Sequence, residues 1–219
     1  STGLVPNDYP YEVAADYPLC LEIVERDVKP ERLLLKPINS FNKTAAKIWW
    51  QHGGPRIALY QQLSQVDRVL VTARVSGSNA VAWANPSQTF DVQLICFPVD
   101  SDAFFSIMQS CFHWIWVSST SSTLGEAGNI RYTPTSCFQT FPLANYTKEI
   151  EDAGKAFNSL RQSIMIKFDI GLTDLYNRFH DPADLASDIV RLREQQSIMD
   201  HAVRSAYGWE DLKLDHGFN

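Results

Sequence analysis

The hydrophobic pattern of the chain is organised around a stretch that runs from Phe104 to Phe141, whose first fourteen residues include ten apolar ones. Its first part, FFSIMQSCFHWIWV, is apolar on nearly every face of a helix, and such a helix belongs in the interior of a domain. A polar loop at 125–129 follows, with two glycines and an asparagine that permit tight or left-handed backbone. An extended run at 130–133 comes next. The pattern predicts a buried helix over 103–118 that holds a recognition loop in place; a core helix followed by an ordinary surface loop is the alternative.

Three apolar runs that precede this helix predict strands. The run at 69–75 is β-branched and continuous, which is typical of a buried strand, and the runs at 80–84 and 90–97 follow after short turns. Strands joined by short turns favour a mostly antiparallel sheet, with the 103–118 helix packed on it. We therefore expect an α+β fold in which a small sheet packs on a buried helix.

Helical patterns lie on both sides of this sheet. Before it, residues 1–15 lack periodicity, Pro18 opens a helix that Pro30 interrupts or ends, and a short helix is expected around 57–60 after a break at 53–55. The segment before that break is polar and aromatic. Of the adjacent Trp49 and Trp50, one is expected to pack and the other to be partly exposed, because neighbours face different ways.

After Pro142 the pattern stays helical. Helices are predicted over 148–170 and 172–179, and Asp181-Pro182 would cap and open a third one. An apolar stripe in that third helix, which Gly208 ends, should pack on the preceding helix; it contains Leu185, Ile189, Leu192, Met199 and Val203. These patterns divide the chain into a linker with an N-terminal helix (1–40), an α/β core (41–145) and a helical region (146–219).

The totals are those of an ordinary globular protein, with 45% hydrophobic and 20% charged residues among 219. No apolar run approaches the length of a membrane span and no signal peptide opens the chain, so we expect a cytoplasmic protein with no membrane partner. The four cysteines (Cys20, Cys96, Cys111 and Cys137) have no CxxC spacing, and we expect reduced core residues and not disulfides or zinc ligands.

The formal net charge of −6 argues, taken alone, against a nucleic-acid partner. Its distribution weakens that objection. Residues 41–80 hold five basic side chains and one acidic side chain, whereas residues 169–219 hold ten acidic and five basic ones. This division is compatible with DNA facing the first section, and a solvated charged surface would give the same counts.

A search for catalytic motifs finds none in the sequence. The turn Asn85-Pro86-Ser87-Gln88 lacks the second proline and the aromatic residue of an adenine methyltransferase loop, and no glycine-rich phosphate loop exists. The five histidines show no metal-ligand spacing, His113 is expected to be a core histidine, and Asp181 beside His180 is better explained as a helix cap. We expect no catalytic residue, no metal and no cofactor in this chain.

Four stretches carry a resemblance to a known family. They are HWIW…SSTL…IRYTPTSCFQTFPL, KIWWQHGGPRIALYQQL at 47–63, DRVLVTARVS at 67–76, and LTDLYNRFHDP…IVRLREQQSIMDHAVRSAYGW. In this order they resemble the target-recognition region and C-terminal helices of large single-chain DNA adenine methyltransferases, which include bifunctional type II restriction–modification enzymes and phage-defence methylases. The resemblance implies a double-stranded DNA partner and an upstream methyltransferase domain of the same parent chain. That domain would use S-adenosylmethionine.

Within this resemblance, Arg131 is the first candidate for a base edge in the major groove, because arginine can grip guanine bidentately. Asn129 and Asn79 suit adenine by the same geometry. Phosphate contacts would position the module; the candidates for them are Lys43, Lys47, Arg56 and Arg74. Ser78, Tyr132 and Trp50 complete the predicted DNA-binding set. Each of these side chains has a plain alternative as a strand-end or solvated surface residue.

A second function of another class stays open. Residues 146–219 could form an acidic helical module that docks another domain or subunit, since an acidic surface suits a basic partner. The sequence leaves the recognised DNA sequence undetermined, because that depends on loop geometry.

Overall fold

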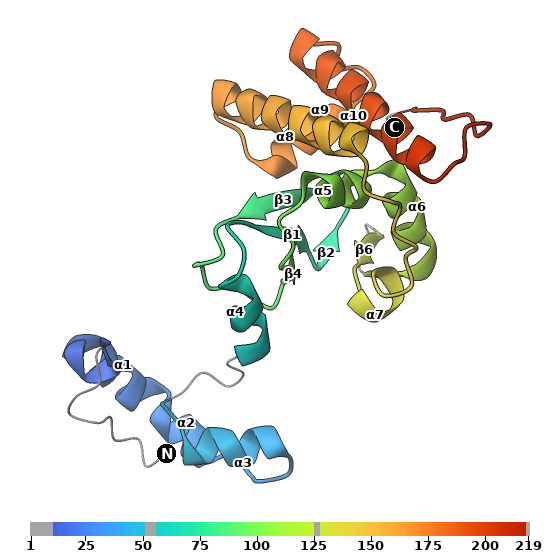
Figure 1. Ribbon diagram of the computed structural model, residues 1–219. Coiled ribbons are helices and arrows are strands. Elements are labelled where there is room, and N and C mark those ends of the chain that lie inside the picture. Colours follow the sequence, from blue (N-terminus) through green and yellow to red (C-terminus); the bar gives the residue numbers. More distant parts are fainter. Residues whose placement is uncertain (1–10, 51–55, 125–127, 218–219) are drawn as a thin grey trace. The chain divides into compact units, whose positions relative to one another are not determined.

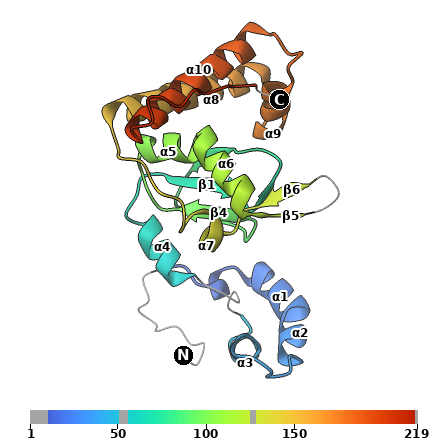
Figure 2. The ribbon, with the colours of Figure 1, turned by 90° about the vertical axis from the view of Figure 1, so that its right-hand side faces the viewer.

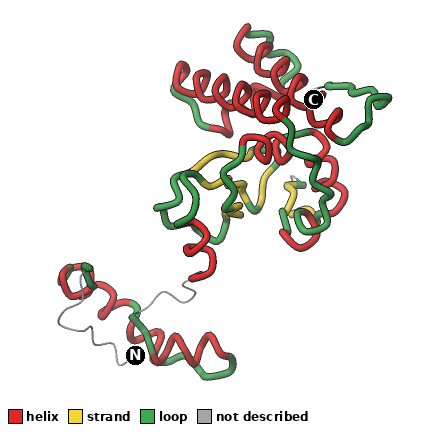
Figure 3. Tube along the Cα trace, in the orientation of Figure 1, coloured by secondary structure: helices red, strands yellow, loops and turns green. Residues whose placement is uncertain are grey.

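The computed structural model of the chain describes residues 11–50, 56–124 and 128–217 (Figure 1). Its contacts divide the chain into two compact units, residues 1–58 and residues 59–219. All strands of the described residues lie in the second unit (Figure 3). Within the described residues, no helix combines the length and hydrophobicity that a bilayer crossing requires. The predicted break at 53–55 and most of the predicted loop at 125–129 lie outside the described residues.

The first unit consists of short helices: η1 (Ala14–Asp16), α1 (Pro18–Asp27), α2 (Lys29–Leu33), α3 (Ser40–Lys47) and the beginning of α4 (Ile57–Leu63). Pro18 occupies the first turn of α1, as predicted, and Pro30 lies in the first turn of α2. Helix α3 was not predicted; the Asn39 side chain caps it by accepting a hydrogen bond from the Asn42 N–H. Among the described residues of this unit only Ala45 is a buried hydrophobic residue.

The predicted antiparallel sheet forms the middle of the second unit. Strands β1 (Val69–Ala73), β3 (Val81–Ala84) and β4 (Leu94–Phe97) pair in the order β3-β1-β4, with Leu70 opposite both Trp83 and Phe97. Leu70, Val81 and Phe97 are buried in the main core. The α+β fold class is therefore confirmed, with the first strand of the sequence in the centre of the sheet.

The apolar stretch after the sheet forms two helices, α5 (Asp102–Gln109) and α6 (Cys111–Thr120), and not the single helix that was predicted. Ser110 separates them: its backbone is extended (ψ 157) and its hydroxyl accepts a hydrogen bond from the His113 N–H, so it caps α6. Every residue of α5 is buried, whereas Ile115 on α6 is exposed. Figure 2 shows α5 between the sheet and the helical layer of α8 and α10.

A second sheet, which the sequence did not predict, contains β2 (Val75–Ser76), β5 (Ser122–Leu124) and β6 (Asn129–Arg131), in the antiparallel order β2-β6-β5. The predicted strand over 69–75 is thus two strands that belong to different sheets and are separated by Arg74. The predicted extended run at 130–133 is confirmed in part as β6. The short helix α7 (Pro134–Cys137) follows it.

Three helices complete the second unit: α8 (Lys148–Phe168), α9 (Leu172–His180) and α10 (Ser187–Ala206). As predicted, the chain turns out of α8 just before Gly171, at Asp169 (φ 51), and out of α10 at Gly208 (φ 72). The Asp181 prediction was wrong, because α10 begins six residues later and the Asp181 carboxylate instead accepts from the Ala183 N–H. Leu185 lies before α10 and is exposed, while the other four residues of the predicted stripe are buried.

Close approach of backbones joins α8 to α5. A Cβ on Gly154 would lie 2.2 Å from the Ser106 Oγ and 2.6 Å from the Asp102 carbonyl oxygen. The Ser106 hydroxyl also lies 2.7 Å from the Ile150 carbonyl oxygen on α8. One hydrophobic core therefore extends from the sheet into the helical region, across residue 145; the functional division at residues 40 and 145 stays a prediction.

The cysteines of the structure are all free thiols, but they are not all core residues. Cys137 is buried, Cys96 and Cys111 are half-buried, and Cys20 on α1 is exposed. The prediction of core cysteines was therefore wrong for Cys20, which belongs to a unit with almost no buried apolar surface.

Candidate nucleic-acid interface

The face of the second sheet that points away from the core is the candidate interface. Arg131 lies in the middle strand, opposite Val75 on one side and Ser122 on the other. Asn129 lies two residues earlier, opposite Leu124. Residues opposite each other on paired strands share a face of the sheet. These five residues therefore form one surface, which we call the outward face, and all of them except the half-buried Asn129 are exposed.

Alternation along β6 decides which side chains belong to this face. Ile130 packs against the main core, and Tyr132, two residues later, is 6% exposed within it. Because successive side chains of a strand point to opposite faces, Asn129 and Arg131 point away from the core. The same alternation removes Tyr132 from the set of candidate DNA contacts, since its ring supports the sheet from the inside.

A buried pair of hydrogen bonds fixes the inward side of β6. The Tyr132 hydroxyl lies 3.1 Å from Nε2 of His113, and Nδ1 of His113 lies 2.8 Å from the Met108 carbonyl oxygen. Burial lowers the pKa of His113 from 6.5 to about 4, against the opposing effect of the Met108 carbonyl, so the ring is neutral at pH 7. A carbonyl only accepts, hence Nδ1 carries the proton and Nε2 accepts from Tyr132. His113 is the core histidine that the sequence predicted.

Cys137 holds the base of the β5–β6 hairpin. Its Sγ lies 3.0 Å from the Ser121 hydroxyl, directly before β5, and 3.3 Å from the Thr133 nitrogen, just after β6. One buried sulfur therefore contacts both ends of the hairpin. Neither Cys137 nor Ser121 was among the predicted site residues, because a single buried cysteine gives no sequence signal for such a role.

Arg74 joins the two sheets through its backbone. Its N–H donates to the Gln93 carbonyl (2.7 Å), and its own carbonyl accepts from the Tyr132 N–H (2.8 Å). Its side chain is half-buried, and Nε is shielded from solvent without a hydrogen-bond partner in the described residues. Arg74 precedes Val75 of the outward face with a side chain that is half-buried and whose Nε is shielded from solvent.

Asn79 is engaged in the core. Its side-chain nitrogen Nδ2 lies 3.1 Å from the Met108 carbonyl oxygen and 3.4 Å from that of Ser110. Its backbone carbonyl accepts a hydrogen bond from the Gln109 side-chain amide (2.6 Å). These bonds fix the break between α5 and α6, so Asn79 leaves the set of candidate base contacts. Ser78 is half-buried, and its N–H donates to the Ser76 hydroxyl (3.1 Å).

The remaining predicted residues belong to the first unit. Lys43, Lys47 and Arg56 are exposed, and Arg56 has a positive φ of 48°. Trp50 is half-buried and meets Trp49 edge to face, with ring centroids 5.6 Å apart, so the two indoles partly shield each other. These four residues form a group separate from Arg131, Asn129, Ser78 and Arg74, which belong to the second unit.

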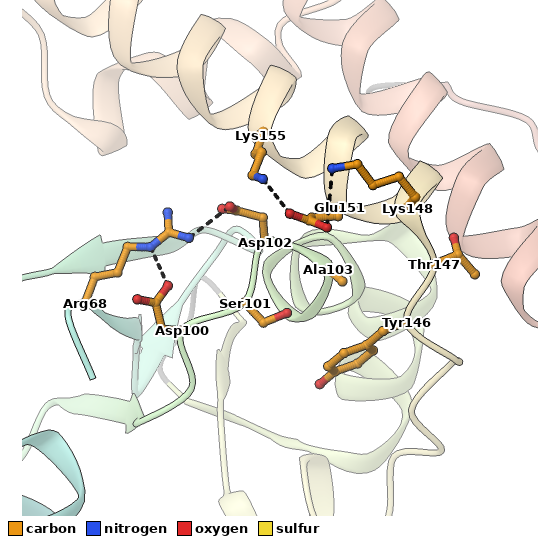
Figure 4. Close-up of a pocket in the computed structure, with 10 residues that line it drawn as sticks. All are labelled: Arg68, Asp100, Ser101, Asp102, Ala103, Tyr146, Thr147, Lys148, Glu151 and Lys155. Atoms are coloured by element: carbon orange, nitrogen blue, oxygen red, sulfur yellow. Dashed lines mark hydrogen bonds and ion pairs between the residues drawn. The ribbon is translucent and has the colours of Figure 1, made fainter. Parts of the chain in front are cut away.

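Another basic residue of the 41–80 section, Arg68, is engaged in ion pairs. Arg68 donates to Asp100 (2.6 Å) and Asp102 (2.9 Å), and its guanidinium lies over the Trp83 ring at 4.1 Å. Figure 4 shows Arg68 and these two carboxylates at the edge of a pocket of about 540 Å³ between α5 and the beginning of α8. Glu151 on the other side of the pocket pairs with Lys148 and Lys155. The pocket thus has opposite charges already paired on both walls.

Comparison with known proteins gives a structural match. No family model matches the chain, and no curated protein matches it. A solved structure of the Type IIL restriction-modification enzyme MmeI in complex with DNA matches 95% of this chain with a TM-score of 0.70 and 18% sequence identity. The chain shares its fold with part of MmeI. The matched region is 26% of the MmeI chain, so this chain corresponds to about a quarter of that enzyme's length.

Proposed function

We propose that this chain is the DNA sequence-recognition module of a restriction–modification or phage-defence DNA adenine methyltransferase. In this proposal, the catalytic domain belongs to the same parent protein, and S-adenosylmethionine binds there. The observation that carries the proposal is the outward face, a three-stranded surface with Arg131 at its centre. The likeness in fold to part of an enzyme solved with DNA supports it.

The chemistry of the outward face suits the major groove. A β-ribbon fits into that groove, where each base pair presents a distinct set of donors and acceptors. Arg131 supplies the donor fork that matches guanine, and Asn129 supplies the amide that matches adenine. Both lie on a strand whose inward side is fixed by Tyr132 and Ile130. Because the strand is already ordered, binding costs less conformational entropy than it would from a free loop.

Phosphate contacts are assigned to Lys43, Lys47, Arg56 and the accessible part of Arg74. Such contacts position a protein on DNA without reading its sequence. If about four of them form, a plot of log K against log [salt] should have a slope of about −3 to −4. Arg68 is left out of this group because two carboxylates already pair with it.

The test is selection of preferred duplexes from a random pool by the purified chain, followed by titration of a labelled duplex by fluorescence anisotropy. We expect a preferred sequence, and we expect Arg131→Ala to weaken binding to it. Arg191→Ala, which removes an exposed arginine of α10, is the matched control and should bind as the unmodified chain does. If no sequence is enriched and Arg131→Ala binds like Arg191→Ala, the proposal is wrong.

The alternative is an acidic docking surface on the helical region. It has less support from the structure than from the amino-acid composition, because several of the acidic residues are paired or buried. Asp184 pairs with Arg178, Asp188 pairs with Lys167, and Asp200 is fully buried. Because one core spans the sheet and the helices, cutting the chain at residue 145 would expose that core and could not separate the two functions. Charge reversal of exposed Asp174 and Glu194 separates them, since it would abolish docking of a basic partner and leave sequence preference on DNA intact.

A further inference from the structure

Three side chains with metal-ligand chemistry meet at the junction of α6 and α10. They are Cys111 at the start of α6, Asp200 in α10, and His216 in the segment that follows α10. One ligand atom from each lies within 4.8 Å of the other two. Asp200 is fully buried, and Cys111 and His216 are half-buried. The group lies outside the outward face and contains none of the residues proposed to contact DNA.

The surroundings hold these ligands in position. Oδ1 of Asp200 accepts from the Cys111 backbone N–H (2.9 Å) and from the Gln196 side chain (3.1 Å), which leaves Oδ2 directed to Nε2 of His216 at 3.0 Å. Nδ1 of His216 lies 3.4 Å from the Ser197 hydroxyl. Histidine ligands of metals commonly have a hydrogen-bond partner of this kind on the second ring nitrogen, and carboxylate ligands on the second oxygen.

The donor set selects the type of cation. A thiolate and an imidazole suit Zn²⁺ and similar transition metals, whereas Mg²⁺ and Ca²⁺ take oxygen ligands almost exclusively. In a tetrahedral site Zn²⁺ lies about 2.3 Å from sulfur and about 2.0–2.2 Å from nitrogen or oxygen, which places its ligand atoms roughly 3.3–3.8 Å apart. Oδ2 of Asp200 and Nε2 of His216 already lie 3.0 Å apart. Metal binding would therefore require the most distant of the three ligand atoms to close by up to about 1 Å.

We propose that Cys111, Asp200 and His216 bind one zinc ion, with water in the fourth position. Binding would release the Cys111 thiol proton, and the resulting thiolate and the Asp200 carboxylate would balance the two charges of the ion. The His216 ring would bind through Nε2 as a neutral imidazole, with its proton on Nδ1 beside the Ser197 hydroxyl. The ion would join α6, α10 and the segment around residue 216. Its role would be to fasten that segment to the helix that carries His113, and so to the support of the outward face.

The experiment is calorimetric titration of Zn²⁺ into the full chain, stripped of metal and free of any polyhistidine tag. We expect one ion per chain with sub-micromolar affinity. The Co²⁺ form should show the near-ultraviolet charge-transfer absorption of a thiolate ligand. His216→Ala and Cys111→Ser should each weaken Zn²⁺ binding by at least about tenfold, and Ser197→Ala by a smaller factor. His180→Ala and Cys20→Ser remove a histidine and a cysteine elsewhere and should have no effect.

Two results would overturn the proposal. One is the absence of both the binding heat and the cobalt–thiolate absorption in the unmodified chain, which needs no variant and so does not depend on how the variants fold. The other is equal Zn²⁺ affinity of the unmodified chain and the two ligand variants, with folding of the variants checked by circular dichroism. In either case Asp200 and His216 are a hydrogen-bonded pair with a neighbouring thiol.

Discussion

The hydroxyl of Tyr132 donates a hydrogen bond to Nε2 of His113 at 3.1 Å, and both side chains are buried. Tyr132 follows directly after β6, and His113 lies in the first turn of α6. The bond therefore fastens the middle strand of the second sheet to the helix behind it. The other ring nitrogen of His113 donates to the Met108 carbonyl, so both nitrogens of this buried ring have a hydrogen-bond partner.

Tyr132→Phe should lower the free energy of unfolding by about 1–3 kcal/mol, because it leaves a buried nitrogen acceptor without a donor. Urea denaturation followed by circular dichroism measures this change. Tyr146→Phe is the matched control, since Tyr146 is 51% exposed and should change stability little. Equal losses in the two variants would mean that the buried bond contributes nothing specific.

The stability of the chain should fall on acidification because of His113. Its folded-state pKa is lowered from 6.5 to about 4, chiefly by burial. Between these two pH values the unfolded chain binds a proton on this ring and the folded chain does not. The free energy of unfolding is therefore independent of this group above pH 6.5. It decreases as the pH falls from 6.5 to about 4, by about 1.4 kcal/mol per pH unit. Denaturation at several pH values should show this slope. His113→Gln should flatten the profile, and an unchanged profile in that variant would contradict the assignment.

Gly154→Ala should destabilise the second unit by roughly 1–3 kcal/mol, the usual cost of forcing extra volume into a packed core. The added methyl group would meet Ser106 and the backbone of Asp102, so α8 would have to move away from α5. Gly171→Ala is the control, because no atom lies within 4 Å of its Cβ position and its φ of −81° suits alanine. Thermal denaturation of both variants measures the difference.

Arg131→Ala should cost about 1–3 kcal/mol of binding free energy on the preferred DNA sequence and relax selectivity at one base pair. Arg131→Lys should also lose selectivity, because lysine keeps the charge and lacks the planar fork. The measurement is a titration series against every single-base variant of the preferred site. Lys47→Ala should weaken binding to all of them alike. A uniform loss in Arg131→Ala would make Arg131 a phosphate contact, and no loss would make it a surface residue.

The sequence predicted what depends on local pattern. The β-branched run before Arg74 and the apolar periodicity of the last long helix each correspond to an element of the structure, as do the breaks near Gly171 and Gly208. The position of Arg131 on an exposed strand also follows from pattern, and the alternation of Ile130 and Tyr132 with their neighbours could have identified Tyr132 as an inward residue.

Tertiary contacts decide the rest. Ser110 interrupts a continuous apolar run because its hydroxyl caps α6 while Asn79, far away in the sequence, binds the carbonyls at the break. Asp181 resembles a helix cap in sequence but forms a local turn instead. Likewise, Cys111 and His216 are separated by about half of the chain, so no ligand spacing could have brought them together.

The hairpin of β5 and β6 has a consequence for how chains of this fold can diverge. The side chains described above that hold it, Ile130, Tyr132 and the sulfur of Cys137, lie on its inner side or at its base. The side chains of the outward face contribute little to folding, so exchanging them leaves the free energy of unfolding almost untouched. Natural variation can therefore alter the exposed chemistry of this sheet one residue at a time while the scaffold stays the same.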